Sequence, residues 1–160
     1  SCSEMTLAQV DEFSKRYSTL KLNPIELAEN NSALANAVDW VIQAKGEEPI
    51  LVYASAPPDA VKQAQKKLGP DLASSTVENA LAKIALAAVQ NGFRRIVVAG
   101  GETAGAVVSN LGIKGIMIGE QIDPGVPTTV SIADPSIGLV LKSGNFGSAD
   151  FFEKAFKVMP

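Results

Sequence analysis

The sequence contains no histidine and only one cysteine, Cys2. Without histidine, this chain alone cannot build a Ser-His-Asp triad, a Cys-His pair or a histidine-ligated zinc site. A single cysteine cannot form an internal disulfide, which fits a reducing, cytoplasmic setting. Cys2 is also a poor candidate for a nucleophile, because no histidine or basic residue next to it in the sequence would activate its thiol.

The chain is also poor in charge and in long apolar runs. Charged residues make up 19% of it, both signs are mixed along the sequence, and the net charge is −3. Non-specific nucleic-acid binding needs a concentrated basic face, so we expect no nucleic-acid partner. No apolar run approaches the length of a membrane span and no secretory signal is visible, so we expect no membrane partner. An apolar content of 46% in 160 residues predicts one folded domain with a hydrophobic core.

Apolar spacing predicts helices and strands that alternate early in the chain, followed by short strands that cluster late. Helices are expected over residues 4–17, 31–45, 59–68, 74–91, 103–111 and 148–158. Ser74, Ser75 or Thr76 is expected to cap the helix at 74–91. Strands are expected over residues 21–22, 49–54, 96–99, 115–119, 126–132 and 139–141. This order favours an α/β fold, with a layered sheet flanked by helices and mixed strands near the C-terminus.

The turn after the expected strand at 96–99 is the first candidate site. Gly100 and Gly101 end the strand, and Glu102 and Thr103 open a helix. Glycines let an anion approach the backbone closely, and a helix N-terminus presents free N–H groups to it. Thr103 could cap the helix and donate its hydroxyl to a phosphate oxygen, and Gly105 would let the first turn of the helix pack tightly on a strand. The alternative is a capped turn that binds nothing, since the spacing matches neither a Walker loop nor the dinucleotide fingerprint.

A second glycine loop, residues 142–147, follows the strand at 139–141. Lys142 ends an apolar strand, where a charged group needs a partner, so we expect it to meet phosphate charge or to pair with Glu102. Glu102 would repel an anion unless it binds ligand hydroxyls, a magnesium ion or a cation. The alternative is a turn before a capped helix, with Lys142 in solvent.

Small hydroxyl residues also stand before the first expected helix. Ser1, Ser3 and Thr6 could contact a nucleotide, or Ser3 or Thr6 could only cap that helix. The segment Asp-Pro-Gly-Val-Pro at 123–127 predicts a rigid turn, which could also border a ligand cleft.

Four segments occur in one order along the chain: residues 1–9, 95–105, 123–127 and 141–147. They contain, in turn, the sequences Ser-Cys-Ser, Gly-Gly-Glu-Thr-Ala-Gly, Asp-Pro-Gly-Val-Pro and Lys-Ser-Gly-Asn-Phe-Gly. Because of these segments, essentially the whole chain resembles the C-terminal nucleotide-binding domain of the four-carbon acid sugar kinase family. The resemblance implies transfer of the ATP γ-phosphate to threonate, erythronate or 3-oxo-tetronate. It also implies that residues 1–160 are one domain of a two-domain kinase, whose N-terminal domain holds the sugar acid and the catalytic base.

The resemblance further implies which residues contact ATP: Ser1 or Ser3, Gly100, Gly101, Glu102, Thr103 and Gly144, to which we add Lys142 from the second loop. Family members often carry serine at position 104, so Ala104 removes one hydroxyl contact here. Magnesium would bridge the phosphate oxygens. We expect no catalytic residue in this chain, weak binding of ATP or ADP, no turnover by the chain alone, and a cytoplasmic location.

Three other functions stay open at this point. One is a non-catalytic nucleotide-binding or regulatory module, and another is a nicotinamide-dependent oxidoreductase on a related sheet, which the missing fingerprint disfavours. The third is a domain that only supports assembly of a dimer, and a homo-oligomer is a possible partner arrangement in any case.

Overall fold

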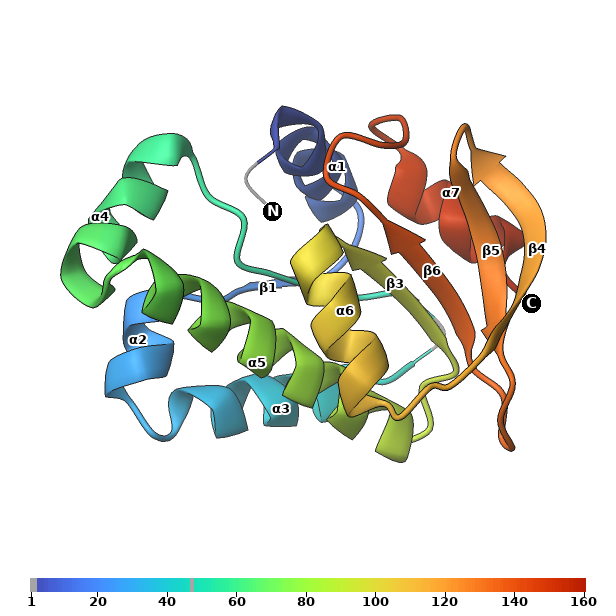
Figure 1. Ribbon diagram of the computed structural model, residues 1–160, viewed down its shortest axis with the longest axis horizontal. Coiled ribbons are helices and arrows are strands. Elements are labelled where there is room, and N and C mark those ends of the chain that lie inside the picture. The colour runs from blue at the N-terminus through green and yellow to red at the C-terminus, as the bar shows by residue number, and fades with distance from the viewer. Residues whose placement is uncertain (1–2, 47) are drawn as a thin grey trace.

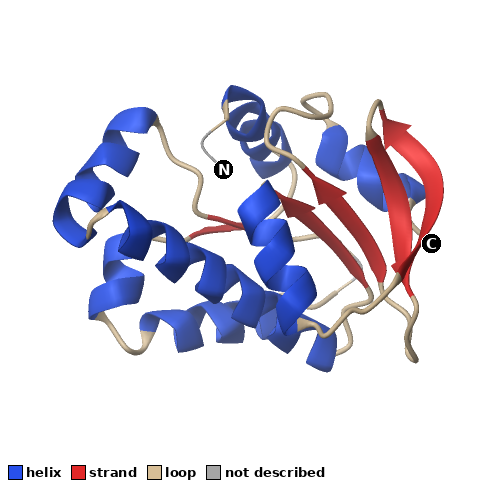
Figure 2. Ribbon diagram, in the orientation of Figure 1, coloured by secondary structure: helices blue, strands red, loops and turns tan. Residues whose placement is uncertain are grey.

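The computed structural model describes residues 3–46 and 48–160. Its elements are, in chain order, α1 (Glu4–Ser14), β1 (Thr19–Lys21), α2 (Pro24–Glu29), α3 (Ala33–Gln43), β2 (Leu51–Tyr53), α4 (Pro58–Leu68), α5 (Pro70–Gln90), β3 (Arg95–Ala99), α6 (Gly101–Asn110), β4 (Ile116–Asp123), β5 (Val126–Ser131), β6 (Gly138–Lys142) and α7 (Phe151–Val158). Helices pack around the strands (Figures 1 and 2). The predicted α/β class is confirmed.

The described strands form two sheets. β1 and β2 form a parallel pair, and the other sheet has the strand order β3-β6-β5-β4. β3 runs parallel to β6, whereas β5 is antiparallel to both of its neighbours, β6 and β4. The predicted mixed strands near the C-terminus are therefore confirmed.

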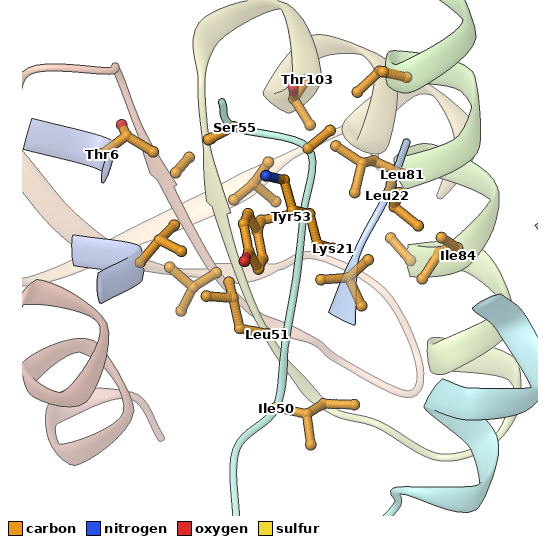
Figure 3. A pocket seen from close by; sticks show the side chains of 18 of the residues that line it. Thr6, Lys21, Leu22, Ile50, Leu51, Tyr53, Ser55, Leu81, Ile84 and Thr103 are labelled. Carbon is orange, nitrogen blue, oxygen red and sulfur yellow. The ribbon is translucent and has the colours of Figure 1, made fainter. Parts of the chain in front are cut away.

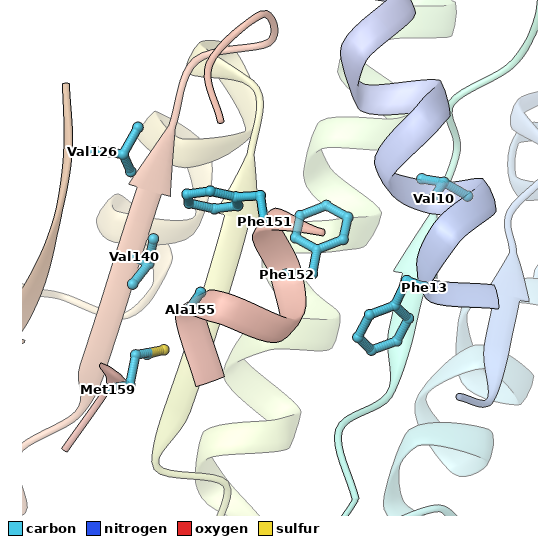
Figure 4. Packing of buried hydrophobic residues seen from close by; sticks show 8 residues of the cluster. All are labelled: Val10, Phe13, Val126, Val140, Phe151, Phe152, Ala155 and Met159. Atoms are coloured by element: carbon cyan, nitrogen blue, oxygen red, sulfur yellow. The ribbon is translucent and has the colours of Figure 1, made fainter. Parts of the chain in front are cut away.

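The larger sheet is covered on both faces. Leu139 of β6 packs with Val107 of α6, whereas the next residue, Val140, packs with Phe151 of α7. Because successive side chains of a strand point to opposite faces, α6 and α7 cover opposite faces of this sheet. Phe13 of α1 extends the α7 side of the core by packing edge-on against Phe152 (Figure 4). A separate cluster joins α2, α3 and α5 to the smaller sheet.

Several helix boundaries differ from the sequence prediction because proline and glycine start helices here. α5 begins at Pro70, so Ser74, Ser75 and Thr76 do not cap it as expected. Pro70 has the φ that a first helical turn needs and lacks an N–H that would need an acceptor there. α2 was not predicted as a helix, yet the Asn23 side chain accepts the Ile25 N–H and Pro24 starts the helix.

One described helix, α5, is long and apolar enough to cross a membrane, although the sequence expectation was that no stretch would be. The core helix of a globular domain passes the same test. α5 packs against α2, α3, α4 and α6, and residues such as Ala82 and Ile84 on it are buried. Its length and composition are therefore weak evidence for a membrane span.

Candidate functional site

The two glycine loops meet at the carboxyl edge of the larger sheet. Gly100 follows β3 with φ +115°, a conformation that residues with a Cβ rarely adopt. Its N–H donates to the carbonyl of Lys142, at the end of β6, over 2.9 Å. Because β3 and β6 are parallel neighbours, this bond places the start of α6 beside the loop that begins at Lys142.

The start of α6 has an open approach to its backbone. α6 begins at Gly101, so Thr103 lies inside the first turn and the expected cap by Thr103 is wrong. A Cβ built at Gly101 would meet nothing within 4 Å, and the same holds at Gly105, which therefore does not pack tightly on a strand as expected. Gly101 and Glu102 are exposed. Packing does not require these glycines, whereas an approaching anion would use the space that they leave.

Lys142 is buried in the second loop, with only 2% of its surface exposed. Its ammonium donates to the carbonyls of Ser143 (3.0 Å) and Gly144 (2.9 Å) and lies 3.4 Å from the Thr6 hydroxyl. It forms no ion pair with a carboxylate of residues 3–46 and 48–160, so both the expected pairing with Glu102 and the solvated alternative are wrong. Burial lowers the pKa of Lys142 to about 8.

The N-terminus of α1 closes the same loop. Ser3 caps α1 by accepting the Thr6 N–H, as predicted, and its hydroxyl also donates to the Gly144 carbonyl over 2.7 Å. The Thr6 hydroxyl donates to that carbonyl over 2.9 Å. The structure thus brings together Ser3, Gly144 and Lys142 of the predicted set, next to Gly100. Ser1 lies outside the described residues.

A cleft of about 1080 Å³ opens beside this edge, between the two sheets. Thr103 and Thr6 line it, and so does Ser55, which follows β2 (Figure 3). In open α/β sheets, ligands bind beyond the carboxyl ends of the strands, which is where these residues lie. Much of the lining is apolar, including Leu22 and Leu81.

Sequence reasoning missed two polar residues of the cleft, Lys21 and Ser55. The Lys21 side chain extends into the cleft (Figure 3) and forms no ion pair with a described residue. Ser55 comes shortly after the apolar strand β2, which was the available signal for it. Lys21 ends the short strand Thr-Leu-Lys, and its local sequence gave no such signal. No group of three or more metal-ligating side chains was found among the residues that the structure describes.

A glycine turn, a helix N-terminus and a cleft at one carboxyl edge are the architecture of an α/β nucleotide-binding domain. The chain belongs to the family described as the nucleotide-binding C-terminal domain, whose model matches residues 1–152. This match confirms the family that the four segments resemble.

The relatives are kinases of sugar acids by name. The chain is 44% identical over 159 residues to a 3-oxo-tetronate kinase of Burkholderia multivorans, covering 99% of this chain and 37% of that protein. It is 48% identical over 138 residues to a 3-oxo-tetronate kinase of Pseudomonas savastanoi pv. phaseolicola, covering 86% of this chain and 32% of that protein. The chain therefore spans about a third of the length of these relatives.

A solved structure matches the fold closely. The crystal structure of a Haemophilus influenzae protein superimposes with a TM-score of 0.93 at 41% identity, covering 99% of this chain and 38% of that one.

Proposed function

We propose that this chain is the ATP-binding domain of a carbohydrate kinase that transfers the γ-phosphate of ATP to a hydroxyl of a four-carbon sugar acid. The observation that carries the proposal is the hydrogen bond from Gly100 to Lys142, because it unites both glycine loops beside the cleft. The names of the relatives support the substrate class, with threonate, erythronate and 3-oxo-tetronate as candidates. The cytoplasm is the proposed location.

The phosphates would lie at the start of α6. The N–H groups of Gly101, Glu102 and Thr103 have no acceptors inside the helix, and the positive end of the helix dipole favours an anion there. Thr103 could add its hydroxyl, and Lys21 would bring a positive charge from across the cleft. The apolar part of the cleft suits the base.

Lys142 and Ser3 would act on the second loop instead. The three donors of the Lys142 ammonium already have acceptors, and Ser3 shares the Gly144 carbonyl. We propose that they hold Gly144 in place so that its backbone can approach the nucleotide.

The residues present also fit a magnesium ion that is bound mainly through ATP. Oxygen donors suit this ion, and Glu102 is an exposed carboxylate in the first turn of α6. Glu102 would hold the ion with the phosphate oxygens, and the ion would neutralise their charge when bound. The base that takes the proton of the sugar-acid hydroxyl is proposed to lie outside this chain, so the chain alone should not turn over substrate.

Calorimetry with ADP and magnesium tests the nucleotide site. We expect the chain to bind ADP and Gly101→Leu to bind it about tenfold more weakly or worse, because the new side chain would occupy the space above the backbone N–H groups. The control Ser109→Leu adds the same side chain on the exposed far end of α6 and should bind ADP normally.

The proposal fails if the folded chain does not bind ADP, or if Gly101→Leu binds it as tightly as the control. Preferential binding of NADH would favour the oxidoreductase instead. Phosphorylation of a sugar acid by the chain alone would contradict the placement of the catalytic base.

A further inference from the structure

β4 is the edge strand of the larger sheet and has no strand beside it on its outer side among the described residues (Figure 1). Ile132 donates its N–H to the carbonyl of Gly115, at the start of the β4–β5 ladder. Backbone groups of a strand alternate in direction, so those of Ile116 and Ile118 point away from β5. The pairing with β5 is regular over Ile116–Ile118, and its first register shift comes after Ile118.

The same three residues are apolar and exposed. Ile116 is 39% exposed, Met117 59% and Ile118 75%. Natural proteins usually protect an edge strand with lysine, proline or a cover, because a bare edge pairs readily with another chain. β4 contains neither lysine nor proline. An open, apolar edge of this kind is suited to a partner.

The sequence of this edge is symmetric about Met117, except that the charges at its two ends have opposite sign. Residues 114–120 read Lys-Gly-Ile-Met-Ile-Gly-Glu, so Met117 is flanked by isoleucines, then glycines, then charges of opposite sign. Lys114 and Glu120 are exposed, and neither forms an ion pair with a residue that the structure describes. A segment with this pattern is complementary to an antiparallel copy of itself.

We propose that β4 pairs with β4 of a second copy of this chain, antiparallel about a twofold axis at Met117. Ile116 of one copy would then exchange backbone hydrogen bonds with Ile118 of the other, which matches the outward direction of these groups. Lys114 would lie opposite Glu120 at both ends, and Gly115 opposite Gly119. The two four-stranded sheets would become one continuous sheet across an isologous interface.

Sedimentation equilibrium of the chain tests this interface. We expect a reversible dimer, with a dissociation constant raised about tenfold by either Lys114→Glu or Glu120→Lys, because each change places like charges opposite each other twice. The double variant K114E/E120K should restore the dimer, since opposite charges face each other again. Ile118→Lys should prevent dimerisation, whereas Leu72→Lys, at an exposed residue of α5, should not.

Disulfide capture tests the position of the axis. In a Cys2→Ser background, Met117→Cys would bring two thiols together, because directly opposed residues have Cα atoms about 4.5–5.5 Å apart, within disulfide range. It should form a covalent dimer under mild oxidation much faster than Leu72→Cys.

A chain that is monomeric at every concentration overturns the proposal. So does a dimer that Ile118→Lys leaves intact, a double charge variant that stays as weak as the single variants, or equal capture of the two cysteines.

Discussion

At the residue scale, the burial of the Lys142 side chain is energetically costly. A buried ammonium loses its hydration, and here backbone carbonyls and a hydroxyl replace water without supplying a negative charge. These hydrogen bonds connect Lys142 to its own loop and to Thr6, and the energetic cost of its burial depends on pH.

The pH dependence of stability should reveal this cost. The pKa of Lys142 is about 8 in the folded chain, whereas the ordinary pKa of a lysine in water is 10.5, so the unfolded chain binds more protons between these two values. The free energy of unfolding should therefore rise as the pH rises through this window, by up to about 3 kcal/mol from Lys142. Urea unfolding of Lys142→Met should lack this rise, whereas Lys157→Met, at an exposed lysine, should keep it. If the free energy of unfolding rose equally with pH in both variants, the rise could not be assigned to Lys142.

Sequence reasoning could identify Lys142 as a buried cation in need of partners, but it could not name them. Thr6 is 136 positions away in the chain, and the carbonyls of Ser143 and Gly144 become acceptors only because the loop folds back over the lysine. Glu102 was predicted as a partner of Lys142 only because its charge is opposite. Charge does not reveal which groups a turn brings within reach of the lysine.

At the scale of elements, the turn after β4 is tied to the start of α7. Asp123 accepts the N–H of Ser148 at 2.9 Å and its hydroxyl at 3.0 Å, and it pairs with Lys154 at 3.1 Å. The Ser148 N–H and Lys154 together hold the pKa of Asp123 below its usual value. The predicted turn at 123–127 is thus also an anchor for the second glycine loop.

Replacing this carboxylate should loosen the anchor. Asp123→Asn should lower the free energy of unfolding at neutral pH by about 1–2 kcal/mol, because hydrogen bonds to a charged acceptor are stronger than those to an amide. Since the folded pKa is depressed, the advantage of aspartate is present above its unfolded pKa and is lost as the pH falls through the folded pKa. Urea unfolding at neutral and acid pH measures both effects, with Asp39→Asn, at an exposed residue of α3, as the control. If Asp123→Asn lowered the free energy of unfolding equally at both pH values, the charge of Asp123 would not be the cause of the destabilisation.

The spacing of apolar residues predicted which segments form helices and which form strands. It did not predict the residues at which the helices begin. Thr103 and the hydroxyl residues at 74–76 are good caps in general, but Gly100 and Gly69 occupy the cap positions and no side chain bonds there. Capping preferences describe local gains of about 1 kcal/mol, which the packing of a whole helix overrides.

At the scale of the whole molecule, the cleft lies between the two sheets, and residues of both line it. A nucleotide bound there would contact both sides. ADP with magnesium at about 100 times its dissociation constant should therefore raise the free energy of unfolding by about 2.7 kcal/mol. Amide exchange should slow at the ends of both β2 and β3, and neither effect should occur in Gly101→Leu. Protection confined to α6 would show that the ligand does not bridge the sheets.

The α/β class was predictable because alternating apolar helices and strands leave few other packings. The division into two sheets was not, since β3 pairs with β6 rather than with its neighbours in the sequence. The glycine loops could be recognised in the sequence because each follows the end of an apolar strand. The same position at a strand end also makes them suitable for binding a ligand. Lys21 was not singled out, because nothing in its local sequence distinguishes it from a surface lysine.

The bonds between α1 and the second glycine loop also bear on the order in which the chain folds. Ser3 and Gln9 find their acceptors, the carbonyls of Gly144 and Ser148, 141 and 139 positions further along the chain. During synthesis α1 leaves the ribosome well before these acceptors, which follow only after β6 has been made. Contacts of such high sequence separation form slowly, because a long loop must close before they contribute. We therefore expect docking of α1 to be a late step of folding, and the second loop to take its final shape only when that step is complete.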